Sequence, residues 1–178
     1  MKKIILTFLI SISTLTANVF ETLDYGDTKE EVQKKLQTNP RIKANVPETM
    51  LARVGLNGSF EVNKDLGGLK FVLYFGWGED GKLNEITLRS KPIEASEYDT
   101  TVAEAFKSAE SLVSSLHGKP AMSNALPPKS DIPEGSILNS HLWHPTQGSI
   151  LLGVAQLESK FHISVRYTQE SIKPVATP

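Results

Sequence analysis

The chain of 178 residues contains no cysteine. This absence excludes disulfide bonds, thiolate metal sites, a cysteine nucleophile and a lipid anchor on an N-terminal cysteine. A single domain of this size does not need covalent staples, since a chain of about 150 residues buries roughly 68–70% of its unfolded surface. We therefore expect the fold to be stabilised by a hydrophobic core alone.

The sequence also lacks an excess of basic residues. It has 19 Lys and Arg against 20 Asp and Glu, which gives a formal net charge of −1 at pH 7. A nucleic-acid-binding protein normally carries a basic face that displaces counterions. We therefore expect no nucleic-acid partner.

No apolar run is long enough to span a membrane, for which roughly 20 residues are needed. The short apolar run Ile4 to Ile12 follows Lys2 and Lys3, and the polar stretch after it ends at Ala17. A basic start, a short apolar segment and a small residue before the cut are typical of a secretory signal peptide. We predict that residues 1–17 form such a peptide.

Cleavage after Ala17 would leave 17 basic against 20 acidic residues. An exported protein without disulfides fits a bacterial envelope. We predict a single globular domain over 18–170, a flexible tail over 171–178 and a periplasmic or secreted location. No transmembrane segment would remain after cleavage.

Two segments have the pattern of amphipathic helices. Thr28 stands three residues before Glu31, which is a capping box at the start of a short helix that Pro40 ends. Over 97–117, apolar residues recur at steps of three and four, and Gly118 follows as a cap. We predict that these two helices pack on a sheet.

The other apolar segments favour strands, and several alternate with a period of two. Asn57-Gly58 is typical of a two-residue hairpin turn between two of them. The segment 150–154 is apolar on both faces and is predicted to be the central strand. We predict strands at 51–56, 59–63, 69–75, 83–89, 137–144, 149–157 and 161–168.

The order of helix then strands, twice along the chain, predicts the α+β class. We expect an antiparallel sheet of about six to seven strands with two main helices packed on one face. Two degenerate copies of one helix-then-strands unit would give the same order, and the sequence leaves that alternative open. The long Pro-rich loop 119–136 either covers a site or only connects the second helix to the sheet.

Gly26 to Leu36 follows the pattern glycine, any residue, Ser/Thr, two residues, acid or amide, Val, three residues, Leu. This pattern resembles the helix-opening motif of the SmpA/OmlA (BamE-like) envelope proteins, and Leu116 to Pro120 is similar to that family's exit from such a helix. The β-lactamase-inhibitory-protein-like fold shares the plan. The resemblance implies a small exported binding or scaffolding domain, although that family's lipid-bearing cysteine is absent here.

Gly76 to Gly81 has the glycine spacing of a dinucleotide-binding loop. Phosphates bind where such a loop opens a helix, but here a strand is predicted to follow. Glu79 and Asp80 would also place two negative charges beside the phosphates. We interpret the segment as a hairpin turn and expect no cofactor.

The histidines do not have the spacing of a metal site. His141 and His144 are three residues apart on a predicted strand, so they point to opposite faces. If the last three strands form a meander, His141 and His162 are separated by one intervening strand, or about 10 Å. We expect no metal site and, because no spacing of nucleophile, base and acid is recognisable, no catalytic residue.

Trp77 lies between two glycines, and Trp143 lies beside His141 and His144. Aromatic rings at strand ends can anchor a ligand or a partner, although large rings more often close a core. We predict that the binding residues are Trp77, Trp143, His141, Tyr74 and Arg166.

These observations predict an exported, non-enzymatic domain that binds or scaffolds another protein of the cell envelope. One alternative is a binder of a small ligand or a cell-wall glycan, in which the Pro-rich loop 119–136 covers the aromatic rings. A further alternative is a hydrolase whose site assembles only in three dimensions.

Overall fold

The computed structural model describes residues 18–64 and 68–174. The predicted signal peptide, 1–17, and the end of the predicted tail, 175–178, lie outside these residues. The described chain contains three α-helices and eight strands: α1 (Lys29–Thr38), β1 (Ile42–Ala44), α2 (Glu48–Val54), β2 (Phe60–Val62), β3 (Phe71–Trp77), β4 (Leu83–Ser90), α3 (Ala103–His117), β5 (Met122–Ser123), β6 (Ile137–Trp143), β7 (Ser149–Leu157) and β8 (Lys160–Thr168).

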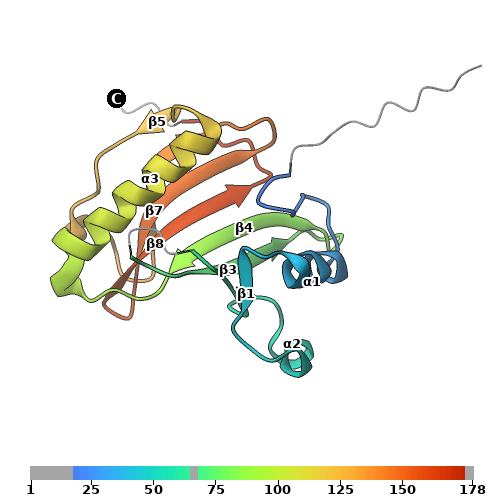
Figure 1. The fold of residues 1–178 in the computed structure, drawn as a ribbon. Helices are drawn as coiled ribbons and strands as arrows, with labels where there is room; N and C mark the ends of the chain where they lie inside the picture. Colours follow the sequence, from blue (N-terminus) through green and yellow to red (C-terminus); the bar gives the residue numbers. More distant parts are fainter. Residues whose placement is uncertain (1–17, 65–67, 175–178) are drawn as a thin grey trace, which may run out of the picture.

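All eight strands form one sheet in the order β1-β2-β3-β4-β8-β7-β6-β5, and every neighbouring pair is antiparallel. This confirms the α+β class and the antiparallel sheet, with eight strands instead of six to seven. The strand predicted to be central, β7, lies beside the true central pair, β4 and β8. Figure 1 shows the sheet with α3 lying across β7 and β8.

The strand order is symmetric about the β4–β8 pair. The first half contributes α1 followed by β1 to β4, and the second half contributes α3 followed by β5 to β8. In each half the strands add one after another from the edge of the sheet towards its centre. The symmetric order is compatible with two copies of one unit, although the second half has no α-helix in the place of α2.

The predicted capping box forms at the start of α1. The backbone amide of Glu31 donates to Thr28 Oγ1 at 3.2 Å, and the Thr28 amide donates to Glu31 Oε2 at 2.8 Å. These hydrogen bonds stabilise the ionised carboxylate and lower the pKa of Glu31. The helix ends at Thr38, just before Pro40, and it buries Val32 and Leu36.

The second predicted helix also forms, but its first turn is wider than an α-helical turn. One turn of π-helix covers Tyr98–Val102, and α3 then continues to His117. Gly118 ends the helix with a φ of +81°, a value that glycine adopts without strain. The helix buries Ala105, Phe106, Ala109 and Val113.

The prediction of a strand over 51–56 is wrong, because α2 occupies Glu48–Val54. Met50, Leu51, Ala52 and Arg53 have good helix propensity, and burial of Leu51 alone is enough to dock one face of so short a helix. Asn57 does not form a two-residue hairpin turn. Its side-chain oxygen instead accepts a hydrogen bond from the Phe75 amide at 2.6 Å, which joins the loop to β3.

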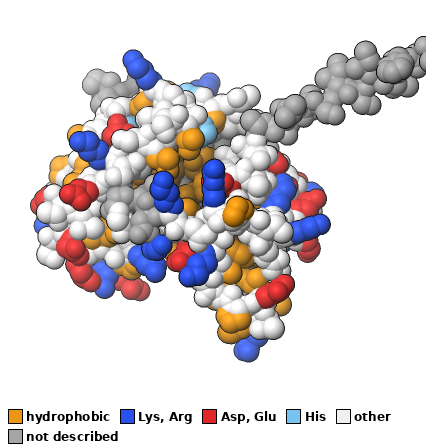
Figure 2. Space-filling view, in the orientation of Figure 1, with side chains coloured by type: hydrophobic (Ala, Val, Ile, Leu, Met, Phe, Trp, Pro, Cys, Tyr) orange, Lys and Arg blue, Asp and Glu red, His pale blue; other side chains and the backbone are white. Residues whose placement is uncertain are grey.

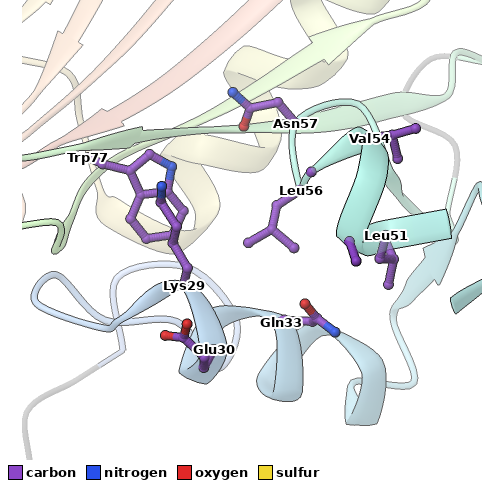
Figure 3. Close-up of a pocket in the computed structure, with 10 residues that line it drawn as sticks. Lys29, Glu30, Gln33, Leu51, Val54, Leu56, Asn57 and Trp77 are labelled. Carbon is purple, nitrogen blue, oxygen red and sulfur yellow. The ribbon is translucent and has the colours of Figure 1, made fainter. Parts of the chain in front are cut away.

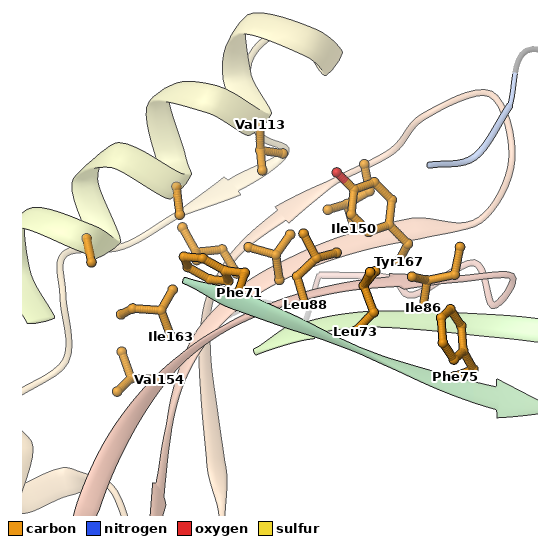
Figure 4. Packing of buried hydrophobic residues seen from close by; sticks show 14 of the residues in the cluster. Phe71, Leu73, Phe75, Ile86, Leu88, Val113, Ile150, Val154, Ile163 and Tyr167 are labelled. Atoms are coloured by element: carbon orange, nitrogen blue, oxygen red, sulfur yellow. The ribbon is translucent and has the colours of Figure 1, made fainter. Parts of the chain in front are cut away.

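A single hydrophobic cluster lies between the helices and one face of the sheet. Alternate residues of the strands point towards α3 in Figure 4, including Phe71, Leu88 and Ile163, with Val113 above them. The buried residues of α1, α2 and α3 all belong to this cluster. The two main helices therefore pack on one face, as predicted, and no helix of the described residues covers the opposite face.

The segment 119–136, predicted to be one long loop, contains the short edge strand β5, and its later part packs against the end of the core. The Tyr98 hydroxyl donates to the Pro127 carbonyl at 2.7 Å, and Ile132 is buried. Near the end of the loop, Glu134 Oε2 accepts from the Ser159 amide at 3.0 Å, in the turn between β7 and β8. The loop thus ties α3 to the far end of the last hairpin.

We expect Gly148→Ala to destabilise the fold far more than Gly81→Ala. The two glycines have nearly equal φ angles of +73° and +74°, so an alanine pays about the same backbone cost of roughly 1–2 kcal/mol at each. Only at position 148 would the new Cβ overlap the Thr168 carbonyl, which adds about 1–3 kcal/mol. Urea unfolding measures the difference, and equal losses would contradict the close approach of this turn to β8.

Candidate functional site

The face of the sheet away from the helices, here called the open face, carries a polar centre on β3, β4 and β8. In the strand register, Tyr74 lies opposite Thr87, and Thr87 lies opposite Arg166. One row along, Arg89 lies opposite Ser164. Two of the predicted binding residues, Tyr74 and Arg166, therefore lie in one row, separated only by Thr87.

Arg89 and Tyr74 are in direct contact on this face. The guanidinium carbon of Arg89 lies 4.6 Å from the centre of the Tyr74 ring, within the range of a cation–π interaction. This contact holds the Arg89 side chain flat against β3. Sequence reasoning missed Arg89, although its alternation with Leu88 in the predicted strand 83–89 placed it on the outward face.

Arg166 has a weaker partner in Glu85. Its Nε atom lies 3.7 Å from Glu85 Oε2, and each side chain is 34% exposed. The distance permits an ion pair but exceeds that of a hydrogen bond. Such a part-exposed pair contributes little, about 0–1 kcal/mol, so Glu85 leaves most of the hydrogen-bonding capacity of Arg166 unused.

Both arginines have a buried Nε atom without a hydrogen-bond acceptor. In the part of the chain that the structure describes, these are the only buried side-chain nitrogen or oxygen atoms in that condition. A buried donor without an acceptor costs on the order of 1–3 kcal/mol. Two such donors on one face make the centre of the open face the least satisfied polar region of the described chain.

The other outward residues of β8 are less exposed than a half-solvated strand would be. His162 and Ser164 point away from the core, but both are buried. The His162 Nδ1 atom lies 2.9 Å from the Ser90 carbonyl and donates to it. These buried side chains lie between the larger side chains of the open face, which include Tyr74, Arg89, Arg166 and Glu85.

Trp77 lies at a different place, on the helix side of the molecule. It closes one end of a groove of about 490 Å³ between α1 and α2, which Figure 3 shows. Lys29 Nζ lies 5.5 Å from the centre of its ring. Val54, on the opposite wall, is 49% exposed, and Figure 2 shows hydrophobic side chains on the lobe that α2 forms. The structure thus separates Trp77 from Tyr74 and Arg166.

Trp143 and His141 are buried, with exposed fractions of 0% and 1%. Their rings stack at 5.5 Å with an angle of 17° between planes, and the Trp143 indole donates to the Gly118 carbonyl at 3.1 Å. Neither side chain can contact a partner in this conformation. The prediction of a surface site at these two residues is therefore corrected, and core packing accounts for both.

His141 also contacts two serines and a glutamate. Ser123 Oγ lies 3.0 Å and Glu110 Oε1 lies 3.3 Å from its Nε2 atom, while Ser140 Oγ lies 3.0 Å from Nδ1. A Ser-His-acid relay needs the acid and the nucleophile on opposite ring nitrogens. Ser123 shares Nε2 with Glu110, so this nitrogen cannot accept the Ser123 proton while it donates to the carboxylate. Ser140 lies at the opposite nitrogen, but it is buried and its hydroxyl also lies 3.3 Å from the Leu152 carbonyl, so a substrate cannot reach it in this conformation. The cluster instead ties α3 to β5 and β6.

No group of three His, Asp or Glu side chains among residues 18–64 and 68–174 could hold a metal ion. The last three long strands are neighbours in the order β6-β7-β8, so β7 separates His141 from His162, as predicted.

Within residues 18–64 and 68–174, none of the helices has the length and apolar character to cross a membrane.

We expect iodide to quench the fluorescence of Trp77 and to leave that of Trp143 nearly unchanged, because only Trp77 reaches the surface. Trp77→Phe should remove most of the quenchable emission. In denaturing urea the remaining tryptophan should become accessible, which serves as the control. Strong quenching of the folded Trp77→Phe variant would contradict the buried position of Trp143.

Comparison with protein-family models, with curated proteins and with solved structures gave no match. The resemblance of Gly26 to Leu36 to the SmpA/OmlA motif stays a prediction.

Proposed function

We propose that this chain is an exported, non-enzymatic domain that binds another protein of the cell envelope through its open face. The observation that carries the proposal is a sheet face that no helix of the described residues covers, with Tyr74, Arg89 and Arg166 close together at its centre. Export is supported by the pattern of residues 1–17, and an exported protein without disulfides fits a bacterial envelope.

A protein partner suits this surface because of its width and its composition. Tyr74 and Arg166 are two strand spacings apart, or about 10 Å, so the contact area is broad. Tyrosine and arginine are the residue types, together with tryptophan, that contribute most often to the energetic centres of protein interfaces. The small buried side chains between them, such as Thr87 and Ser164, leave room for a partner to approach the sheet.

A second candidate function is the binding of a small ligand or a cell-wall glycan in the groove beside Trp77. The volume of about 490 Å³ lies in the range of small-molecule sites, and an aromatic ring with Lys29, Glu30 and Gln33 nearby offers stacking and hydrogen bonds to a sugar. A thermal-shift screen with saccharides tests this function, and stabilisation that Trp77→Ala abolishes would favour it over a protein partner.

Site-specific cross-linking tests the protein partner. We expect p-benzoylphenylalanine in place of Tyr74 to cross-link one envelope protein reproducibly in the native host, because this position lies at the centre of the open face. The matched control is the same substitution at Leu116, which is 64% exposed on α3. Equal products from both positions, or none from position 74, would argue against binding through the open face.

A further inference from the structure

We propose that the open face recognises carboxylates of an extended acidic segment of its partner, with Arg89 and Arg166 as the receiving groups. This inference rests on the proposed function and names the chemistry of the partner. It follows from the placement of the two arginines, from their surrounding charges and from their unused donors.

The two arginines have the spacing of alternate residues in a strand. Arg89 lies opposite Ser164, and Arg166 is two residues further along β8 on the same face. Diagonal neighbours of this kind are separated by about 7–8 Å. Residues i and i+2 of an extended segment are about 6.8 Å apart and project on the same side. A partner segment with acidic residues at alternate positions would therefore place one carboxylate at each guanidinium.

The charges around Arg89 leave it without a carboxylate. Of the two acidic side chains on the nearby strands, Glu85 is paired with Arg166 at 3.7 Å, and Glu61 is 4.0 Å from Lys91. Among the described residues, no carboxylate lies within ion-pair distance of Arg89, whose guanidinium lies against the neutral ring of Tyr74. An incoming carboxylate is thus the missing partner of a positioned cation.

The same acidic residues favour a carboxylate over a phosphate group. Glu61 lies opposite Val72, and Val72 lies opposite Arg89, while Glu85 is next to Arg166. A phosphate carries close to two negative charges at neutral pH, so these glutamates would repel it more strongly than a carboxylate with a single charge. A planar carboxylate also matches the fork of the guanidinium.

The buried Nε atoms give this interaction a specific signature. Arg166 is 34% exposed although its Nε atom is buried, so a carboxylate first meets the end of the guanidinium group. Paired hydrogen bonds through Nε and Nη then require the side chain to turn away from the sheet. The Nε–H resonances of Arg89 and Arg166 should therefore report the binding directly.

The test is a titration of the nitrogen-15-labelled chain with a short peptide of alternating Thr and Glu. We expect the Nε–H signals of Arg89 and Arg166 to move downfield together. Arg89→Gln and Arg166→Gln should each weaken the binding about tenfold or more, as for the loss of a charge-assisted hydrogen bond. Arg53→Gln, at an exposed position on α2, should bind like the unchanged chain. Arg89→Lys keeps the charge but loses the fork, and it should bind weakly as well.

Three results would overturn the inference. They are equal binding of a Thr-Gln peptide, equal weakening by Arg53→Gln, and displacement of the acidic peptide by inorganic phosphate at comparable concentration. Urea unfolding of each variant separates a loss of binding from a loss of folding. A variant that unfolds at the same urea midpoint as the unchanged chain is folded, so its weaker binding is a property of the site. If the cross-link from position 74 persists in Arg89→Gln, binding through the open face stands and the acidic chemistry fails. If position 74 gives no cross-link, the proposed function itself fails.

Discussion

The pairing of β4 with β8 is the contact on which the rest of the structure depends. Each half of the chain supplies one main helix and four strands, and neither half alone completes the core. The central pair sets Leu88 opposite Val165 and Ile86 opposite Tyr167 on the helix side, where all four are buried. Because these residues belong to one cluster that both α1 and α3 cover, the register of a single pair of strands joins the two halves.

The same register determines the opposite face. Side chains alternate along a strand, so burying Leu88 and Val165 necessarily sends Arg89 and Arg166 to the other side of the sheet. If the register slipped by one residue, the apolar side chains would move to the open face and the arginines would move into the core. Burying these unpaired charges would cost too much free energy for the fold to form. The composition of the open face is thus a consequence of the packing of the core.

The candidate site was only partly accessible to sequence reasoning. Tyr74 and Arg166 could be assigned to outward positions because their strands alternate clearly, and the structure places them in one row. Trp143 could not be placed, since an aromatic ring near a strand end can anchor a partner even though such rings more often pack in a core. The contact of His141 with Glu110 and Ser123 joins three elements, and no spacing along the chain predicts such a contact.

The sequence by itself determined the local structure of this protein. The capping box of α1, the period of α3 and the alternation of β3, β4 and β8 follow from hydrogen bonds and burial within a few residues. Only the tertiary structure decided that two four-stranded halves meet at β4 and β8, that α2 replaces a predicted strand, and that Arg89 and Arg166 become neighbours 77 positions apart in the chain. The physical reason is that strand pairing depends on hydrogen bonds between distant segments, and their partners are chosen by the core as a whole.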